Sequence, residues 1–97
     1  MTHAVILRAR AEEDIRVAVR WYESQQSMLG EDFLLQLRRI LERVAEFPAA
    51  FPLVHKTVRR ALLAKYPYLA FYVVEPSRVV VLAVLHTSRN PVAWPRQ

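Results

Sequence analysis

The stretch VVVLAVLHTSRNPVAW, residues 79–94, decides the fold of this 97-residue chain, because it opens with seven consecutive aliphatic residues. A strand with one solvent-facing side alternates apolar and polar residues, whereas an uninterrupted apolar run indicates a strand that is covered on both faces. We therefore expect residues 79–85 to lie inside a sheet, with a helix packed on one face. His86 and Arg89 follow at the end of that strand.

Two helices are predicted upstream of this strand. Residues 11–27 carry apolar side chains at the three- and four-residue spacing of one helix face, and Gly30 follows as the expected turn. A second helix begins with the acidic residues Glu31 and Asp32, which suit the positive end of a helix dipole, and ends at Pro48. Two helices joined by a short turn form a hairpin.

Four extended runs are predicted, at residues 4–7, 58–63, 68–74 and 79–85. Short links join the last three runs and favour antiparallel neighbours, so we expect a three-stranded meander. The segment FPAAFPLVHKT, residues 47–57, contains two prolines and no clear period and is expected to be a connecting loop. The predicted class is α+β, in one domain over residues 1–97: a short N-terminal strand, a two-helix hairpin and a three-stranded antiparallel meander, with the helices on one face of the sheet.

Composition excludes several classes of protein. A chain of 97 residues without cysteine has one modest core and neither disulfides nor thiolate metal sites. The longest apolar run has seven residues, whereas a membrane-spanning helix needs roughly 20, so no membrane segment is expected. The three histidines lack metal-ligand spacing, so no metal or other cofactor is expected. Without a signal-peptide pattern, the expected location is the cytoplasm.

The net charge of +5 is distributed unevenly along the chain. Residues 1–47 contain seven arginines and eight acidic residues, whereas residues 48–97 contain seven basic residues and only one acid, Glu75. A basic half attracts polyanions or an acidic protein partner. A charge that serves only solubility is the alternative interpretation.

Basic side chains are expected to gather near the end of the last strand. Lys56 lies in the connecting loop, and Arg59 and Arg60 are adjacent on the next strand and so point to opposite faces. Together with His86 and Arg89 they would suit phosphate, because arginine binds it in a bidentate fashion and neutral histidine exchanges a proton near pH 7. Two simpler interpretations stay open: a His86 bonded to backbone, and edge-strand arginines that discourage aggregation.

The order of these elements and their motifs resembles the RelE/ParE superfamily of toxins from bacterial type II toxin–antitoxin modules. The resemblance covers nearly the whole chain and rests on four motifs, DIRVAVRWYE (14–23), FPLVHKTVRRALL (51–63), KYPYLAFYVV (65–74) and VVVLAVLHTSRNPVAW (79–94). Its members share one fold but differ in mechanism.

RelE-like members are ribosome-dependent endoribonucleases in which the 2′-hydroxyl attacks the adjacent phosphate of mRNA, helped by a basic cluster. An arginine typically begins their middle meander strand, and Leu69 occupies that place here. The PYLAFY form resembles ParE, whose characterised members poison DNA gyrase through protein–protein contact. The resemblance therefore favours a gyrase poison without enzymatic activity over an mRNA interferase, with an inactive interaction module as a further alternative.

The resemblance also implies a partner and a set of site residues. The partner is a cognate antitoxin, a small acidic protein with a disordered tail. In a nuclease the catalytic residues would be His86, Arg59, Arg60 and Arg89. In a binding toxin, contact with the target or antitoxin would fall to Lys56, Arg59, Arg60, Arg89, Trp94 and Arg96. Trp94 is also expected to cover the open end of the core.

Overall fold

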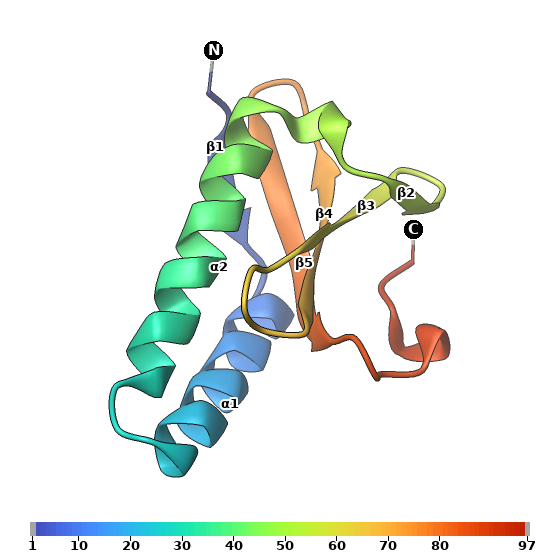
Figure 1. Ribbon diagram of the computed structural model, residues 1–97. Helices are drawn as coiled ribbons and strands as arrows, with labels where there is room; N and C mark the ends of the chain where they lie inside the picture. The colour runs from blue at the N-terminus through green and yellow to red at the C-terminus, as the bar shows by residue number, and fades with distance from the viewer. Residues whose placement is uncertain (1, 97) are drawn as a thin grey trace.

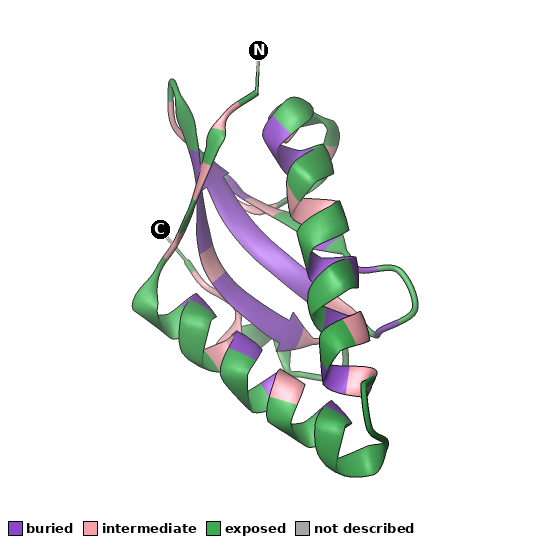
Figure 2. Cartoon of the chain, turned by 90° about the vertical axis from the view of Figure 1, so that its left-hand side faces the viewer, coloured by how far each residue is buried: buried purple, intermediate pink, exposed green. Residues whose placement is uncertain are grey.

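A computed structural model describes residues 2–96, which form a five-stranded sheet with two helices on one face (Figures 1 and 2). In chain order the elements are β1 (Ala4–Leu7), α1 (Ala9–Gln25), α2 (Leu29–Glu46), the 3-10 helix η1 (Pro48–Ala50), β2 (Leu53–His55), β3 (Val58–Leu62), β4 (Tyr68–Val74), β5 (Arg78–His86) and the 3-10 helix η2 (Pro91–Ala93). The strand order in the sheet is β1-β5-β4-β3-β2. The α+β class and the antiparallel meander β3-β4-β5 are confirmed.

The sheet is wider than the predicted meander because two short strands join its edges. β1 pairs in parallel with the first half of β5, Ala4 lying opposite Arg78. β2 pairs antiparallel with β3 inside the segment that was expected to be a connecting loop. That expectation is wrong because a three-residue strand carries too few side chains to show alternation. β2 forms because its backbone hydrogen-bonds to the free edge of β3.

β5 is buried on both faces, as its apolar sequence predicts. On the helix side its valines at 79, 81 and 84 belong to the larger core, between the sheet and the two helices. On the other side residues 80, 83 and 85 belong to a smaller core that also contains Phe71. The alternation changes phase at Leu82, where a bulge lies between the partners of Phe71 and Tyr72. The smaller core is covered by Val54 and Trp94.

The turn between the helices is made by Met28 and not by Gly30. Met28 has a φ of 74°, whereas Gly30 lies buried in the first turn of α2. A Cβ atom on Gly30 would come within 2.9 Å of the carbonyl oxygen of Val19 in α1, so glycine allows the two helices to approach closely. The Glu23 carboxylate accepts hydrogen bonds of 3.0 Å from the N–H groups of Met28 and Gly30 and so caps α2 from α1.

Aromatic rings connect the helical hairpin to the turn between β3 and β4. Tyr22 packs against Phe33 and Tyr66, with ring centroids 5.4 and 4.8 Å away. The Tyr66 hydroxyl donates a 2.6 Å hydrogen bond to Asp32 of α2. Burial, assisted by this bond, raises the pKa of Tyr66 to about 12, and the same bond lowers the pKa of Asp32.

Candidate functional site

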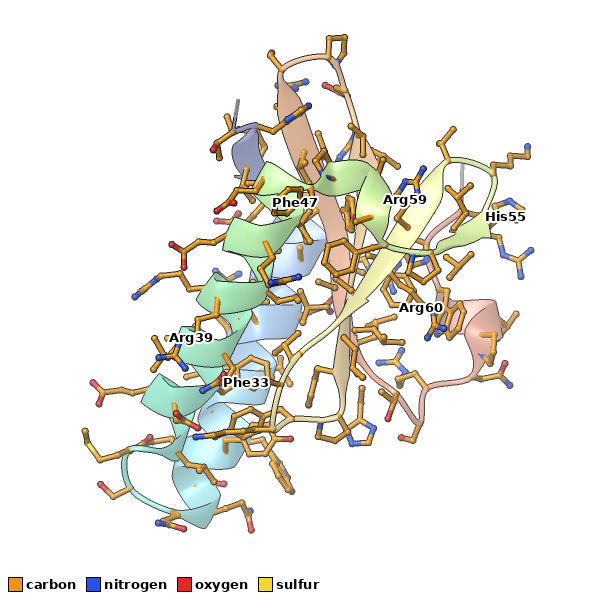
Figure 3. All side chains as sticks on the ribbon, turned by 45° about the horizontal axis from the view of Figure 1, so that its top comes forward. Phe33, Arg39, Phe47, His55, Arg59 and Arg60 are labelled. Atoms are coloured by element: carbon orange, nitrogen blue, oxygen red, sulfur yellow. The ribbon has the colours of Figure 1, made fainter. Side chains whose placement is uncertain are left out.

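The predicted basic site residues fall into two groups, and Trp94 belongs to neither. The hairpin group, around β2 and β3, consists of Lys56, Arg59, Arg60 and Arg96. Figure 3 labels Arg59 and Arg60 of this group. The strand-end group, at and after the end of β5, consists of His86 and Arg89. The sheet register separates Arg59, Arg60 and His86, whereas the gathering of Lys56 and Arg89 with any of them stays a prediction.

The sheet register explains this separation. Arg60 lies opposite Phe71, on the face away from the helices. Arg59 lies opposite Tyr72, and His86 lies opposite Tyr68, on the helix side of the sheet. Tyr68 and Tyr72 are four residues apart on β4, which corresponds to about 13 Å along the strand. One phosphate group cannot contact the side chains of Arg59, Arg60 and His86 together.

Arg59 is used to hold the backbone in place. Its Nη1 donates hydrogen bonds to the carbonyl oxygens of Phe51 at 2.6 Å and Ala49 at 3.2 Å. The Tyr72 hydroxyl donates to the carbonyl oxygen of Pro48 at 2.7 Å, so β3 and β4 both hold the segment around η1. Burial raises the pKa of Tyr72 to about 12, although the nearby Arg59 charge acts in the opposite direction.

The other three members of the hairpin group present unpaired positive charge. Within residues 2–96, Lys56, Arg60 and Arg96 form no ion pair, whereas ion pairs are formed by Arg10, Arg16, Arg20, Lys65 and Arg78. Apolar side chains accompany this charge, because Leu53 and Leu62 are 55% and 58% exposed. The surface around β2 and β3 is therefore both basic and apolar, which suits an acidic amphipathic partner.

His86 is a backbone-bonded histidine. Its Nδ1 accepts a 3.0 Å hydrogen bond from the backbone N–H of Ser88. A neutral ring that accepts at Nδ1 carries its proton on Nε2, so Nε2 is a hydrogen-bond donor. The nitrogen that could take up a proton thus faces Ser88, and the ring itself lies 5.2 Å from that of Tyr68.

Asp14 makes a contact between α1 and β5 that sequence reasoning missed. Its carboxylate accepts a 3.0 Å hydrogen bond from the backbone N–H of Val84, at the part of β5 that extends beyond its pairing with β1. Burial raises the pKa of Asp14, and the Val84 hydrogen bond and the charges of Arg10 and Arg89 act in the opposite direction. No sequence motif marks a helix carboxylate that bonds to a distant strand.

The segment after β5 folds back over the smaller core. Arg10 donates a 2.9 Å hydrogen bond to the carbonyl oxygen of Ala93, and the Trp94 ring packs against Phe71 at 5.1 Å. The expectation that Trp94 covers the core is met on the face away from the helices. Its Nε1 is buried and has no hydrogen-bond partner among the described residues.

Leu69 is the residue at which the resemblance to RelE-like nucleases leads one to expect an arginine. It is only 4% exposed and lies in the smaller core, opposite Leu62 on one side and Leu85 on the other. An arginine there would have to place its charge in an apolar environment. Across residues 2–96, no three potential ligands among His, Asp and Glu come together as a metal site.

An apolar groove lies between β1, α1 and α2. It has a volume of 660 Å³, and its apolar walls include Val5, Leu7, Ile15, Leu34, Leu37 and Leu41. Charged residues at its border are Arg38, Glu42 and Glu46. β1 forms one edge of the sheet, so its outer backbone groups have no strand partner in the described chain. None of the helices described is both long and apolar enough to cross a bilayer.

A family sequence model and a solved structure both relate this chain to the same group of proteins. The sequence model described as the ParE toxin of the type II toxin–antitoxin system parDE matches residues 5–91. The fold is similar to a chain of the solved chromosomal ParDE toxin–antitoxin system from P. aeruginosa, with a TM-score of 0.64 and 18% sequence identity, covering 88% of this chain and 96% of that one. No curated protein sequence gives a significant match.

Proposed function

Because the chain belongs to the family of ParE toxins of type II toxin–antitoxin systems, we propose that it arrests bacterial growth by binding DNA gyrase in the cytoplasm, without enzymatic activity of its own. A toxin of such a system has an antitoxin partner, and we propose that a cognate acidic antitoxin neutralises it. The observation that carries this proposal is the separation of Arg59, Arg60 and His86 by the sheet.

Three details favour binding over RNA cleavage. The Arg59 guanidinium donates to two backbone carbonyl groups, and the Nδ1 atom of His86 accepts from backbone. The buried Leu69 offers no charge to a phosphate. A basic cluster that stabilises the charge of a reacting phosphate needs its donors within hydrogen-bond distance of one point. Lys56, Arg60 and Arg96 instead spread free charge over a surface.

The test compares the two activities on one preparation. Expression of the chain alone should stop growth, and the purified protein should inhibit gyrase supercoiling while leaving mRNA on translating ribosomes intact. His86→Ala should leave gyrase inhibition in place. An mRNA cut that falls about 10²–10⁴-fold in His86→Ala, the loss typical of a removed general base, would establish the mRNA interferase instead. Unchanged growth despite abundant folded protein would establish the inactive interaction module.

The groove and the hairpin group suggest how the antitoxin binds. We infer that its disordered tail places apolar side chains in the groove beside β1 and acidic side chains on Arg60 and Arg96. The groove lies on the helix side of the sheet and Arg60 on the opposite face, so the tail passes around an edge of the sheet to contact both surfaces.

Charge reversal tests this arrangement. Arg60→Glu should weaken antitoxin binding, and the loss should shrink at high salt because the contact is electrostatic. Arg39→Glu is the matched control, because Arg39 is exposed on α2, away from the hairpin group (Figure 3). Arg59 is unsuitable, because its replacement would also release the η1 segment. Equal affinity of the Arg60→Glu and Arg39→Glu variants would place the acidic contacts elsewhere.

A further inference from the structure

A second cleft, between α1 and the adjoining ends of β4 and β5, has no part in the function proposed above. It has a volume of 480 Å³, and its walls include Val17, Trp21, Tyr22, Pro67, Tyr68 and His86. Its volume lies within the range of small-molecule sites, about 300–1,000 Å³. No carboxylate lines it.

The apolar part of the cleft is an exposed indole. Trp21 is 56% exposed, and it meets Tyr22 edge to face, with ring centroids 5.0 Å apart at 86°. Val17, one helical turn earlier, is 52% exposed. Tyr22 anchors the indole from the core side, so Trp21 is held at the protein surface with much of its side chain open to a ligand.

The polar part of the cleft consists of two directional groups. The Nε2–H of His86 is a donor, because Nδ1 is occupied by the backbone of Ser88. The Tyr68 hydroxyl has no hydrogen-bond partner within residues 2–96, and burial raises its pKa, so it stays protonated at neutral pH. An aliphatic or phenyl side chain that filled the cleft would leave both groups without partners, which disfavours such a ligand.

Three cations lie near the cleft residues in the sequence, and two of them pair with carboxylates, Arg20 with Glu13 and Lys65 with Asp32. Arg20 precedes Trp21 in the sequence, Lys65 lies two residues before Pro67, and Arg89 lies three residues after His86. Arg20 and Lys65 are both mostly exposed, and their ion pairs are long, at 3.8 and 3.6 Å. Such weakly held surface cations can turn toward phosphate groups.

We propose that this cleft binds an unpaired base of a single-stranded nucleic acid, which stacks on Trp21 and is hydrogen-bonded at its edge by Tyr68 and His86. A nucleobase combines a flat π face with acceptors and donors on its rim, which matches both parts of the cleft. The backbone on either side of the base places phosphates near Arg20 and Arg89. This inference does not depend on gyrase being the target.

The experiment separates the base from its phosphates. In the Trp94→Phe variant, Trp21 is the sole tryptophan and its fluorescence reports on the cleft. Titration with a short oligothymidylate should quench this fluorescence, and an abasic oligonucleotide of equal length should bind about tenfold more weakly, as expected from loss of one stacked base. Equal binding of the two oligonucleotides would mean phosphate contact alone and would overturn the proposal.

Variants locate the site. Trp21→Ala, followed by fluorescence anisotropy of a labelled oligothymidylate, should lower affinity to that of the abasic oligonucleotide, and His86→Ala should lower it in the Trp94→Phe background. Phe47→Ala is the matched control, because Phe47 is also an exposed aromatic residue, 55% exposed at the far end of α2 (Figure 3). If Trp21→Ala is unfolded by circular dichroism, His86→Ala decides. Unchanged affinity in folded cleft variants would overturn the proposal.

A protein ligand is the competing outcome. If oligothymidylate does not bind while Trp21→Ala abolishes inhibition of gyrase, the cleft contacts protein and the nucleobase proposal is wrong. If gyrase is not inhibited at all but the base-dependent quenching is observed, the nucleobase proposal stands and the gyrase proposal fails.

Discussion

Gly30→Ala should destabilise this protein, although alanine is the better helix former. In an open helix the substitution stabilises by about 1 kcal/mol. Here the new Cβ would come within 2.9 Å of the Val19 carbonyl oxygen, and within 3.1 Å of both Val19 Cγ1 and Glu23 Oε1. The carbonyl oxygen belongs to the backbone of α1, so it cannot rotate away and the two helices must separate.

The size of the effect follows from these contacts. Overpacking at a close contact costs about 1–3 kcal/mol. If Glu23 retreats, its two bonds to the amino-terminal end of α2 weaken as well, each contributing about 1 kcal/mol. Both losses oppose a propensity gain of about 1 kcal/mol. We expect a net loss of about 2 kcal/mol, which corresponds to a fall in Tm of roughly 8–16 °C for a domain of this size.

Urea denaturation followed by circular dichroism measures the loss. The Gly30→Ala/Val19→Ala double variant is the internal control, because it removes Cγ1 and leaves the carbonyl oxygen in place. The double variant should show little coupling between the two sites. A Gly30→Ala variant as stable as the parent would refute this account of the helix contact. Full recovery in the double variant would show that the side chain of Val19, and not the backbone, is the obstacle.

Three further predictions follow from the buried tyrosines, the C-terminal segment and the η1 tether. Burial raises the pKa of Tyr66 and Tyr72 to about 12, above the value of about 10 for an unfolded tyrosine. The contribution of these two tyrosines to stability is therefore complete below pH 10 and is lost as the pH rises through 12. A urea midpoint that stays constant over this pH range would contradict this prediction. Trp94→Ala should lower the free energy of unfolding by about 2 kcal/mol, roughly half the loss for a fully buried tryptophan. It should also expose Phe71 to a hydrophobic dye. Unchanged dye binding would count against Trp94 as the cover of the smaller core. Arg59→Lys keeps the charge, but its nitrogen lies one bond closer to the backbone than the Nη1 atom that donates to both carbonyls, so we expect a loss of about 1 kcal/mol and faster proteolysis near η1. Parental protease resistance would show that the tether is dispensable.

The sequence predicted those elements whose formation depends on their own pattern. The seven apolar residues at 79–85 identified a strand with two covered faces, and the apolar spacing at 11–27 identified α1 to within two residues at each end. The length of the links after β3 and β4 identified the meander. These features follow from burial and short-range geometry, which a sequence records directly.

Features that depend on a distant partner were missed. Glycine is a residue type that is common in turns, but Gly30 is needed for its close contact with Val19 on the other helix. The four residues of β1 do not reveal that β5 is their neighbour. Arg59 and His86 are chemically suited to phosphate, and only the positions of nearby backbone groups show that both are already engaged. Sequence reasoning therefore identified which residues could be reactive and could not show whether they meet.

The pairing of the first strand with the last has a consequence for synthesis. β1 is made before its partner residues 78–81, and residues 8–77 separate the two in the sequence. Until β5 arrives, the helical hairpin has no complete sheet to cover, and the middle of the sheet is missing. Long-range pairing of this kind is slow to form, because a long loop must close before any contact stabilises it. A ribosome that stops before β5 thus releases a fragment that lacks the centre of the fold, and the sheet can be completed only after β5 has been made.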